Sequence, residues 1–241
     1  EEEAAYWKSL ERKWIAGARA IFTVNHLIAG WMEQEYGVGP VRCLYNCQEL
    51  QPAPVPKEKL SARVGGRPVA LYQGVIGLDR GLEELVASAR HQKEIVIAIR
   101  GAGERLPALR ELARQHDIDV LFLDAVPSSE VVAAAAQADI GLIPFLPSCM
   151  NHYWSTPNKL FEYMMAGLPM AGSDIPELQT FVQGNGLGRL FDPYSPADIA
   201  ATLTSMNGLE EMGRKARELA ENQYCWEREG QKLLQVYEDL R

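Results

Sequence analysis

The chain has 241 residues, of which 47% are hydrophobic and 23% are charged, and its net charge is −8. This composition is typical of a globular protein with a sizeable core, and the acidic balance argues against non-specific binding to nucleic acid. No apolar run is long enough to span a membrane and no basic start precedes an apolar segment, so we expect neither a membrane span nor a signal peptide.

Cysteine and histidine spacing bears on metal binding and on the redox environment. The four cysteines match neither a C-x-x-C pair nor a disulfide framework, and the four histidines lack the spacing of zinc ligands. We therefore expect reduced thiols, a cytoplasmic location and no metal site.

The first part of the chain predicts a small strand–helix–strand unit preceded by a helix. A helix is expected over 4–17, a strand over 20–24, a helix from His26 to Tyr36 and a strand over 41–45. Residues 51–68 are rich in proline and include a glycine pair, which indicates a linker or a long surface connection.

From residue 69 onward, short apolar runs alternate with amphipathic segments. This alternation predicts an α/β domain with a Rossmann-like, doubly wound parallel sheet, whose ligands bind at the carboxyl ends of the strands. Strands are expected at 69–73, 95–99, 119–123, 139–143 and 169–172, and helices at about 80–91, 104–115, 129–137, 158–166, 196–205 and 208–222, with a terminal helix after Trp226.

The segment PNKLFEYMMAGLP, from Pro157 to Pro169, predicts one short helix with a functional first turn. The free backbone N–H groups and the dipole at its start favour an anion such as a phosphate, and Lys159 adds positive charge. Glu162 lies one turn further on, in an apolar stretch where ribose hydroxyls would supply it with donors. The alternative is an ordinary core helix whose Glu and Lys are solvated.

Three loops after predicted strands hold further candidates. In QGVIGLDRGLEEL, Gly74 allows a ligand close to the backbone, and Arg80 at the start of the next helix can fork onto a diphosphate, unless it is simply a surface arginine. Gly101 and Gly103 are expected to pack a strand tightly against a helix. The long segment at 144–159 is expected to be functional because of its length.

Several segments in a fixed order resemble a known family. They are YQGVIGLDRGLEEL, IRGAG, VLFLDAV, ADIGLIPF, PNKLFEYMMAGLPMAGSDIPEL and GLGRLFDPYSPADIAATL. Together they resemble the donor-binding half of the retaining glycosyltransferases of family 4, which have the GT-B fold. The resemblance implies that residues 1–55 end an N-terminal acceptor-type domain, that residues 56–225 form the donor domain, and that the helix at 226–241 packs back on the N-terminal remnant.

The resemblance also assigns roles to individual positions. Glu162 would bind the ribose, while Arg80 and Lys159, with the helix start at Asn158 and Leu160, would stabilise the leaving diphosphate. In the loops, Gly74 would lie near the donor and Val126 would cover the nucleotide base.

The chain departs from the family pattern at two positions. Val75 replaces the first residue of a basic pair, and Trp154 replaces a glutamate eight positions before Glu162. Trp154 could stack on the donor sugar, and His152 or Asn151 could substitute for the missing carboxylate.

Three functional hypotheses follow. The first is a hexosyltransferase that uses a UDP- or GDP-sugar and no cofactor, retains the anomeric configuration and acts on a glycan or glycolipid in polysaccharide biosynthesis. A missing N-terminal domain would supply any peripheral membrane contact. The second is a nucleotide-sugar-binding module that is inactive alone and acts with a separate acceptor-domain chain. The third, a GT-B-like sugar-nucleotide epimerase, would need catalytic carboxylates and a histidine that the sequence does not place.

Overall fold

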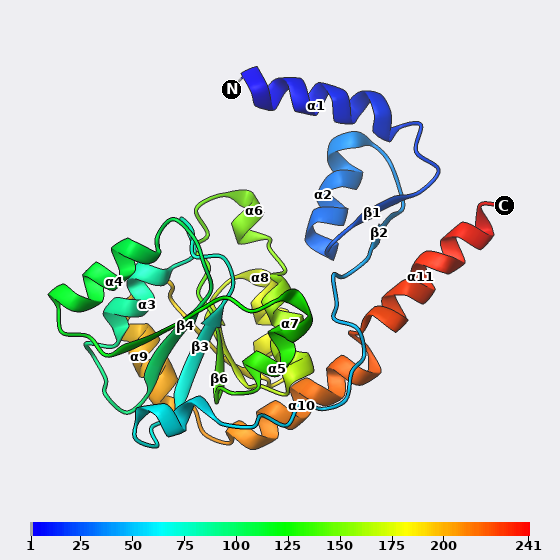
Figure 1. Cartoon of the computed structure of the whole chain (residues 1–241). Helices are drawn as coiled ribbons and strands as arrows, with labels where there is room; N and C mark the ends of the chain where they lie inside the picture. Colours follow the sequence, from blue (N-terminus) through cyan, green and yellow to red (C-terminus); the bar gives the residue numbers. More distant parts are fainter. Residues whose placement is uncertain (1) are drawn as a thin grey trace. The chain divides into compact units, whose positions relative to one another are not determined.

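The computed structural model describes residues 2–241, which fall into two compact units (Figure 1). Unit 1 combines Glu1–Glu49 with Tyr224–Arg241, and unit 2 is Leu50–Gln223. These boundaries lie within a few residues of the divisions expected after residues 55 and 225. Each unit is described by itself below.

Unit 1 is built on two parallel strands. Its elements are α1 (Glu2–Ile15), β1 (Ile21–Thr23), α2 (His26–Tyr36), β2 (Val41–Cys43) and α11 (Trp226–Asp239). The Asn25 side chain accepts a hydrogen bond from the Ile28 amide at 2.9 Å, which caps α2. In α11, the fully buried Glu229 accepts from the Tyr45 amide at 2.9 Å through Oε2, so this helix is fixed to the segment after β2.

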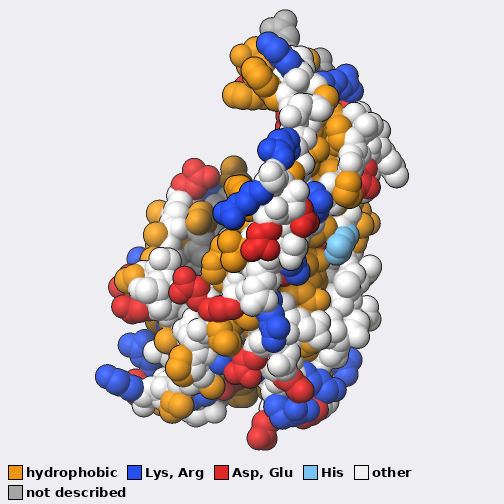
Figure 2. Space-filling view, turned by 90° about the vertical axis from the view of Figure 1, so that its right-hand side faces the viewer, with side chains coloured by type: hydrophobic (Ala, Val, Ile, Leu, Met, Phe, Trp, Pro, Cys, Tyr) orange, Lys and Arg blue, Asp and Glu red, His pale blue; other side chains and the backbone are white. Residues whose placement is uncertain are grey.

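The surface of unit 1 is unusually apolar on α1. Tyr6, Trp7 and Trp14 are all more than half exposed, and hydrophobic side chains gather over this helix in Figure 2. Elsewhere on the face shown in Figure 2, basic and acidic side chains are interspersed and form no large patch of one sign. Among the described helices, none is both long and apolar enough to cross a membrane.

Unit 2 contains a six-stranded parallel sheet with the order β5-β4-β3-β6-β7-β8. This confirms the predicted Rossmann-like doubly wound fold. The strands are β3 (Val69–Gln73), β4 (Val96–Arg100), β5 (Val120–Leu123), β6 (Ile140–Ile143), β7 (Met170–Ser173) and β8 (Gly188–Phe191). The helices are α3 (Leu82–Ser88), α4 (Leu106–Gln115), α5 (Val131–Ala135), α6 (Met150–Tyr153), α7 (Asn158–Ala166), α8 (Pro176–Leu178), α9 (Pro196–Ser205) and α10 (Leu209–Asn222), with short turns η1 (Leu60–Val64), η2 (Ser128–Glu130) and η3 (Gln179–Gln183).

Both faces of the sheet are covered because its central strands are apolar on both sides. Helices α3, α4 and α9 lie on one face, and α5, α7 and α10 lie on the other (Figure 1). Tyr72, Ile97 and Ile140 belong to the core cluster with α3, α4 and α9, whereas their strand neighbours Gln73 and Ala98 alternate to the other face. The four central strands β3, β4, β6 and β7 are therefore buried along their whole length, whereas the edge strands β5 and β8 are partly exposed.

Several elements of unit 2 were not predicted, among them η3, β8, η1 and α6. Strand β8 lies at the sheet edge and reads GRLF, with a glycine and an arginine that weaken the apolar pattern. A short 3-10 helix, η1, lies in the segment interpreted as a linker, and Leu60 within it is buried. The four-residue helix α6 lies in the segment interpreted as a long irregular loop.

Sheet order changes direction between β3 and β6, and a tyrosine from α7 holds these two strands. The Tyr163 hydroxyl donates to the Leu71 carbonyl at 2.9 Å and accepts from the Gln73 amide at 3.0 Å. Its ring lies over Gly141 of β6, where an added Cβ would be 2.4 Å from the ring. Glycine at this position therefore makes room for the ring, and the hydroxyl bonds backbone groups of β3 where its pairing with β6 ends.

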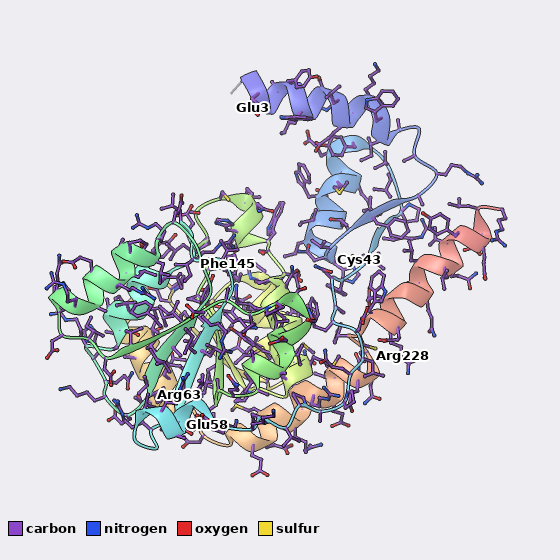
Figure 3. All side chains as sticks on the ribbon, viewed as in Figure 1. Glu3, Cys43, Glu58, Arg63, Phe145 and Arg228 are labelled. Carbon is purple, nitrogen blue, oxygen red and sulfur yellow. The ribbon has the colours of Figure 1, made fainter. Side chains whose placement is uncertain are left out.

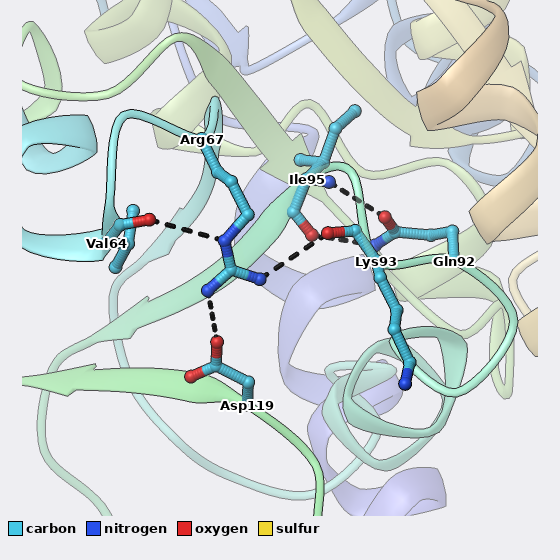
Figure 4. A network of polar contacts seen from close by, with 6 residues as sticks. All are labelled: Val64, Arg67, Gln92, Lys93, Ile95 and Asp119. Carbon is cyan, nitrogen blue, oxygen red and sulfur yellow. Dashed lines mark hydrogen bonds and ion pairs between the residues drawn. The ribbon is translucent and has the colours of Figure 1, made fainter.

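Polar contacts join the segments at the amino ends of the strands (Figure 4). Arg67 donates to the carbonyls of Val64 at 3.3 Å and Lys93 at 3.4 Å and forms an ion pair with Asp119. These contacts join the segments that lead into β3, β4 and β5. Ligands of such sheets bind at the other side, at the carboxyl ends of the strands.

Candidate functional site

A cavity of about 410 Å³ opens beside the carboxyl ends of β3 and β6, at the point where the strand order reverses. The segment after β3, helix α6 and the first turn of α7 supply its walls. Seven of the ten residues named as candidates line this cavity, namely Gly74, Arg80, Asn151, His152, Asn158, Lys159 and Glu162. The fold thus brings together side chains that are up to 88 positions apart, the separation of Gly74 and Glu162 (162 − 74).

Lys159 is a buried cation held between two aromatic rings. Its ammonium lies 4.7 Å from the centroid of the Tyr72 ring and 4.8 Å from that of Phe145. Phe145, labelled in Figure 3, follows β6, so the two rings come from the two strands that flank the switch point. Burial lowers the pKa of Lys159 to about 8, although Glu162 opposes this shift. A bound anion would favour the charged form.

Arg80 lies in the turn before α3 and not in the helix itself, contrary to expectation, because the helix begins at Leu82 after Gly81. The guanidinium of Arg80 lies 4.7 Å from the centroid of the Phe145 ring. Gly81 has a φ of 64°, and an added Cβ there would be 2.1 Å from the Pro144 carbonyl oxygen. This close backbone contact fixes the turn against the segment after β6 and places Arg80 on the cavity wall.

Glu162 faces the same cavity and is half-buried, so it is not the fully solvated glutamate of the alternative interpretation. Its Oε2 accepts a hydrogen bond from Nε2 of Gln73 at 3.3 Å. Burial raises the pKa of this carboxyl, while the Gln73 hydrogen bond and the charge of Lys159 lower it. The carboxylate is therefore held in the cavity with capacity left for a hydroxyl-bearing ligand.

Helix α6 carries His152 and Asn151 to the cavity wall. The Nδ1 of His152 is 3.0 Å from the Ser148 hydroxyl, and its ring contacts Phe145 edge-on at 5.9 Å between centroids. Trp154 does not line the cavity, contrary to the prediction that it contacts the donor sugar. The reason is the unpredicted helical turn, which brings Asn151 and His152 to the wall and ends at Trp154.

Leu160 also lies elsewhere than predicted. Its side chain is fully buried in the core, and its amide donates to the Pro157 carbonyl at 2.9 Å. Neither its side chain nor this N–H group is available to a phosphate. Asn158 and Lys159 are thus the residues of this helix start that line the cavity.

A second cavity of about 280 Å³ adjoins the first and contains Val126. The two cavities share Gln73, Gly74 and Val75 as a common wall. An added Cβ at Gly101 would lie 1.9 Å from the Gly74 carbonyl oxygen, so this glycine is required for packing against the loop after β3. The same holds for Gly103 against Ile76, at 2.1 Å. Both glycines pack loop on loop, and not strand on helix as expected.

Several lining residues were missed because they lie in apolar runs that are typical of buried strands. Tyr72, Gln73 and Phe145 line the first cavity, and Arg100 lines the second. A signal was present in two of them, since Gln73 and Arg100 are polar residues that close otherwise apolar strands at the carboxyl edge. Among the residues that the structure describes, no group of three or more His, Cys, Asp or Glu side chains is arranged to hold a metal ion.

The first cavity combines two cations, a carboxylate and aromatic walls within one domain, and the second offers an apolar recess beside it. The sheet and its flanking helices match the Rossmann-like domains of GT-B glycosyltransferases. The chain belongs to the family described as "Glycosyl transferases group 1", whose model matches residues 67–207.

Solved structures support the fold. Sucrose-phosphate synthase from Thermosynechococcus elongatus is 18% identical with a TM-score of 0.77 over 96% of this chain and 61% of its own. Anabaena Alr3699/HepE in complex with UDP and glucose is 13% identical, with a TM-score of 0.77 over 96% and 65%. A glycosyltransferase from Rickettsia africae is 13% identical, with a TM-score of 0.75 over 97% and 66%. The chain therefore spans less than two thirds of the length of these structures, and a search of curated protein sequences finds no match.

Proposed function

We propose that this chain binds a nucleotide sugar as the donor-binding part of a retaining, family 4 hexosyltransferase. The observation that carries the proposal is that Arg80, Lys159 and Glu162 line one cavity, beside an apolar recess of a size suited to a base. Family membership supports sugar transfer, and the similar Anabaena Alr3699/HepE has been solved with UDP-glucose as well as with UDP. We therefore propose a UDP-sugar as the donor, with a GDP-sugar as the alternative, and a glycan or glycolipid as the acceptor.

In this proposal, each part of the donor meets a different part of the site. The base enters the recess lined by Val126, the ribose hydroxyls donate to Glu162, and the diphosphate lies beside Lys159, Arg80 and the start of α7. When the bond between the sugar and the diphosphate breaks, negative charge develops on the leaving oxygen, and two cations fixed beforehand stabilise it. His152 and Asn151 face the end of the cavity where the sugar would lie.

Calorimetry with UDP, GDP and ADP tests this function. The wild-type chain is expected to bind UDP, and Glu162→Gln is expected to weaken binding by about 1.5–3 kcal/mol, the scale of a hydrogen bond to a charged group. Glu210→Gln, which changes an exposed glutamate in the first turn of α10, serves as the control and should bind as the wild type does. No binding of any of the three nucleotides, or equal binding by the Glu162 variant, would refute the proposal.

A second function, a binding module that works with a separate acceptor-domain chain, is favoured by unit 1. Parallel sheets are normally larger and covered on both faces, yet β1 and β2 pair only with each other among the described strands. The exposed aromatic side chains of α1 add apolar surface that a further domain or chain could cover. If the chain binds UDP but releases no sugar from a UDP-sugar, with or without simple acceptor glycans, the module is the better description.

A further inference from the structure

Gln73 is a buried amide that separates the two cavities. It closes β3, is 4% exposed, and lines both the cavity with Glu162 and the recess with Val126. Its Nε2 donates to the Val131 carbonyl at 3.0 Å and to Oε2 of Glu162 at 3.3 Å, and its Oε1 accepts from Nη1 of Arg100 at 3.3 Å. Both ends of a side chain that is costly to bury are therefore paired.

The partners of Gln73 determine which way its amide points. Arg100 can only donate and the Val131 carbonyl can only accept, so Oε1 must face Arg100 and the NH₂ group must face Val131 and Glu162. Arg100 is itself 5% exposed and held by two 2.7 Å hydrogen bonds, to the Ala134 carbonyl and to Oε1 of Gln137. A chain of fixed contacts thus runs from the end of α5 through Arg100 to Gln73.

We propose that Gln73 is a positioning residue: oriented by Arg100, it holds the Glu162 carboxylate in the one rotation that accepts from both hydroxyls of a ribose diol. This inference rests on the proposed nucleotide binding. Gln73 engages one carboxylate oxygen from within the protein, so the carboxylate is not free to turn away from the ligand. Arg100 polarises the amide and strengthens its donor end. The pair Gln73–Glu162 then selects ribonucleotides over deoxyribonucleotides.

The readout is the ratio of the dissociation constants for 2′-deoxy-UDP and UDP. Both ligands carry the same base and diphosphate, so effects on Arg80, Lys159 and the recess cancel in the ratio. For the wild type we expect a ratio of about ten, the scale of one hydrogen bond to a charged group. Gln73→Met keeps the side-chain volume and removes the donor, and its ratio should fall to about two or less.

Gln73→Glu provides a second variant with a distinct signature. At low pH, one proton shared between the two adjacent carboxyl groups allows residue 73 to donate to Glu162 as the amide does. At high pH both carboxylates are charged and the donor is lost. The facing groups are Arg100 from β4, Val131 at the start of α5, and Lys159 and Tyr163 from α7. The ratio should therefore be close to the wild-type value at pH 5.5 and should fall toward one at pH 8.5.

The outcomes separate this inference from the proposed function. If the wild type binds no nucleotide, the proposed function fails. If it binds UDP with a ratio near one, or if Gln73→Met keeps the wild-type ratio, nucleotide binding stands and the role of Gln73 is refuted. Should Gln73→Met fail to fold in a thermal melt, a Gln73→Glu ratio that does not change with pH overturns the inference equally.

Discussion

Replacing Lys159 with methionine is expected to weaken UDP binding by about 2–4 kcal/mol, the usual cost of removing one partner of a buried charge pair. The same change should raise the free energy of unfolding by about 1–2.5 kcal/mol at pH 7. The folded protein lowers the pKa of this lysine to about 8 from an unfolded value of about 10.4, so the charged form costs about 3 kcal/mol. Loss of the contacts with Tyr72 and Phe145 offsets about 0.5–2 kcal/mol of that gain.

The pH dependence of the wild type follows from the same shift. Below about pH 8 the ammonium is charged and the affinity for UDP should be highest. Above about pH 8 the affinity should fall, because binding must then include the uptake of a proton by Lys159. The free energy of unfolding should instead rise between about pH 8 and pH 10.4. Over this range the unfolded chain binds more protons than the folded chain at this position. Lys159→Met should show neither trend.

Calorimetry between pH 6.5 and 9.5 and urea unfolding over the same range measure both effects. Lys57→Met, which removes an exposed lysine of unit 2, is the matched control and should leave affinity and stability unchanged. A Lys159→Met variant that binds UDP like the wild type would show that this lysine does not meet a phosphate. A variant that is less stable at pH 7 would show that the contacts of the ammonium with the two rings outweigh the cost of its buried charge.

Gly141→Ala is expected to destabilise unit 2 by about 3 kcal/mol, at the upper end of the range for overpacked cores. The new methyl group would lie 2.4 Å from one carbon of the Tyr163 ring and 2.6 Å from another, so the ring must move. The ring cannot move without breaking the hydrogen bonds of its hydroxyl to Leu71 and Gln73. Because Glu162 directly precedes Tyr163 in α7, the movement of Tyr163 should also weaken nucleotide binding.

Urea unfolding and calorimetry on the same samples check this prediction. Gly77→Ala is a suitable control, since the nearest atom to its added Cβ is a Val75 methyl carbon at an ordinary 3.8 Å. A loss of stability no greater in Gly141→Ala than in Gly77→Ala would mean that the tyrosine adapts easily and does not fix the two strands.

Periodic segments allowed much of unit 2 to be predicted from sequence. The bounds predicted for β3 and α7, 69–73 and 158–166, coincide with the structure because apolar spacing and helix-ending residues agree there. Strand β8 and helix α6 escaped prediction for the opposite reason. Strand β8 contains a glycine and an arginine that weaken its apolar pattern, and α6 has four residues, too few for a helical period to be visible.

The residues of the candidate site also fall into those that the sequence predicted and those that it did not. Arg80, Lys159 and Glu162 were predicted because charged residues near a helix start or a glycine turn suggest a ligand. Gln73 and Arg100 were not: the polar residue that ends each apolar strand marks the position, but its role depends on contacts between strands and α5 that no local pattern encodes. Leu160 was assigned through the general tendency of helix starts to bind phosphate, which ignored the fact that its own amide bonds to Pro157.

The hydroxyl of Tyr163, bonded to the backbone of β3, has a thermodynamic consequence for the neighbouring glutamate. These two hydrogen bonds fix the position of α7 relative to β3. Glu162 therefore reaches its position when the domain folds, before any ligand binds. The conformational entropy of ordering this carboxylate is then lost during folding. A nucleotide would meet a preorganised acceptor, and less of its intrinsic affinity would be spent on rearrangement within unit 2.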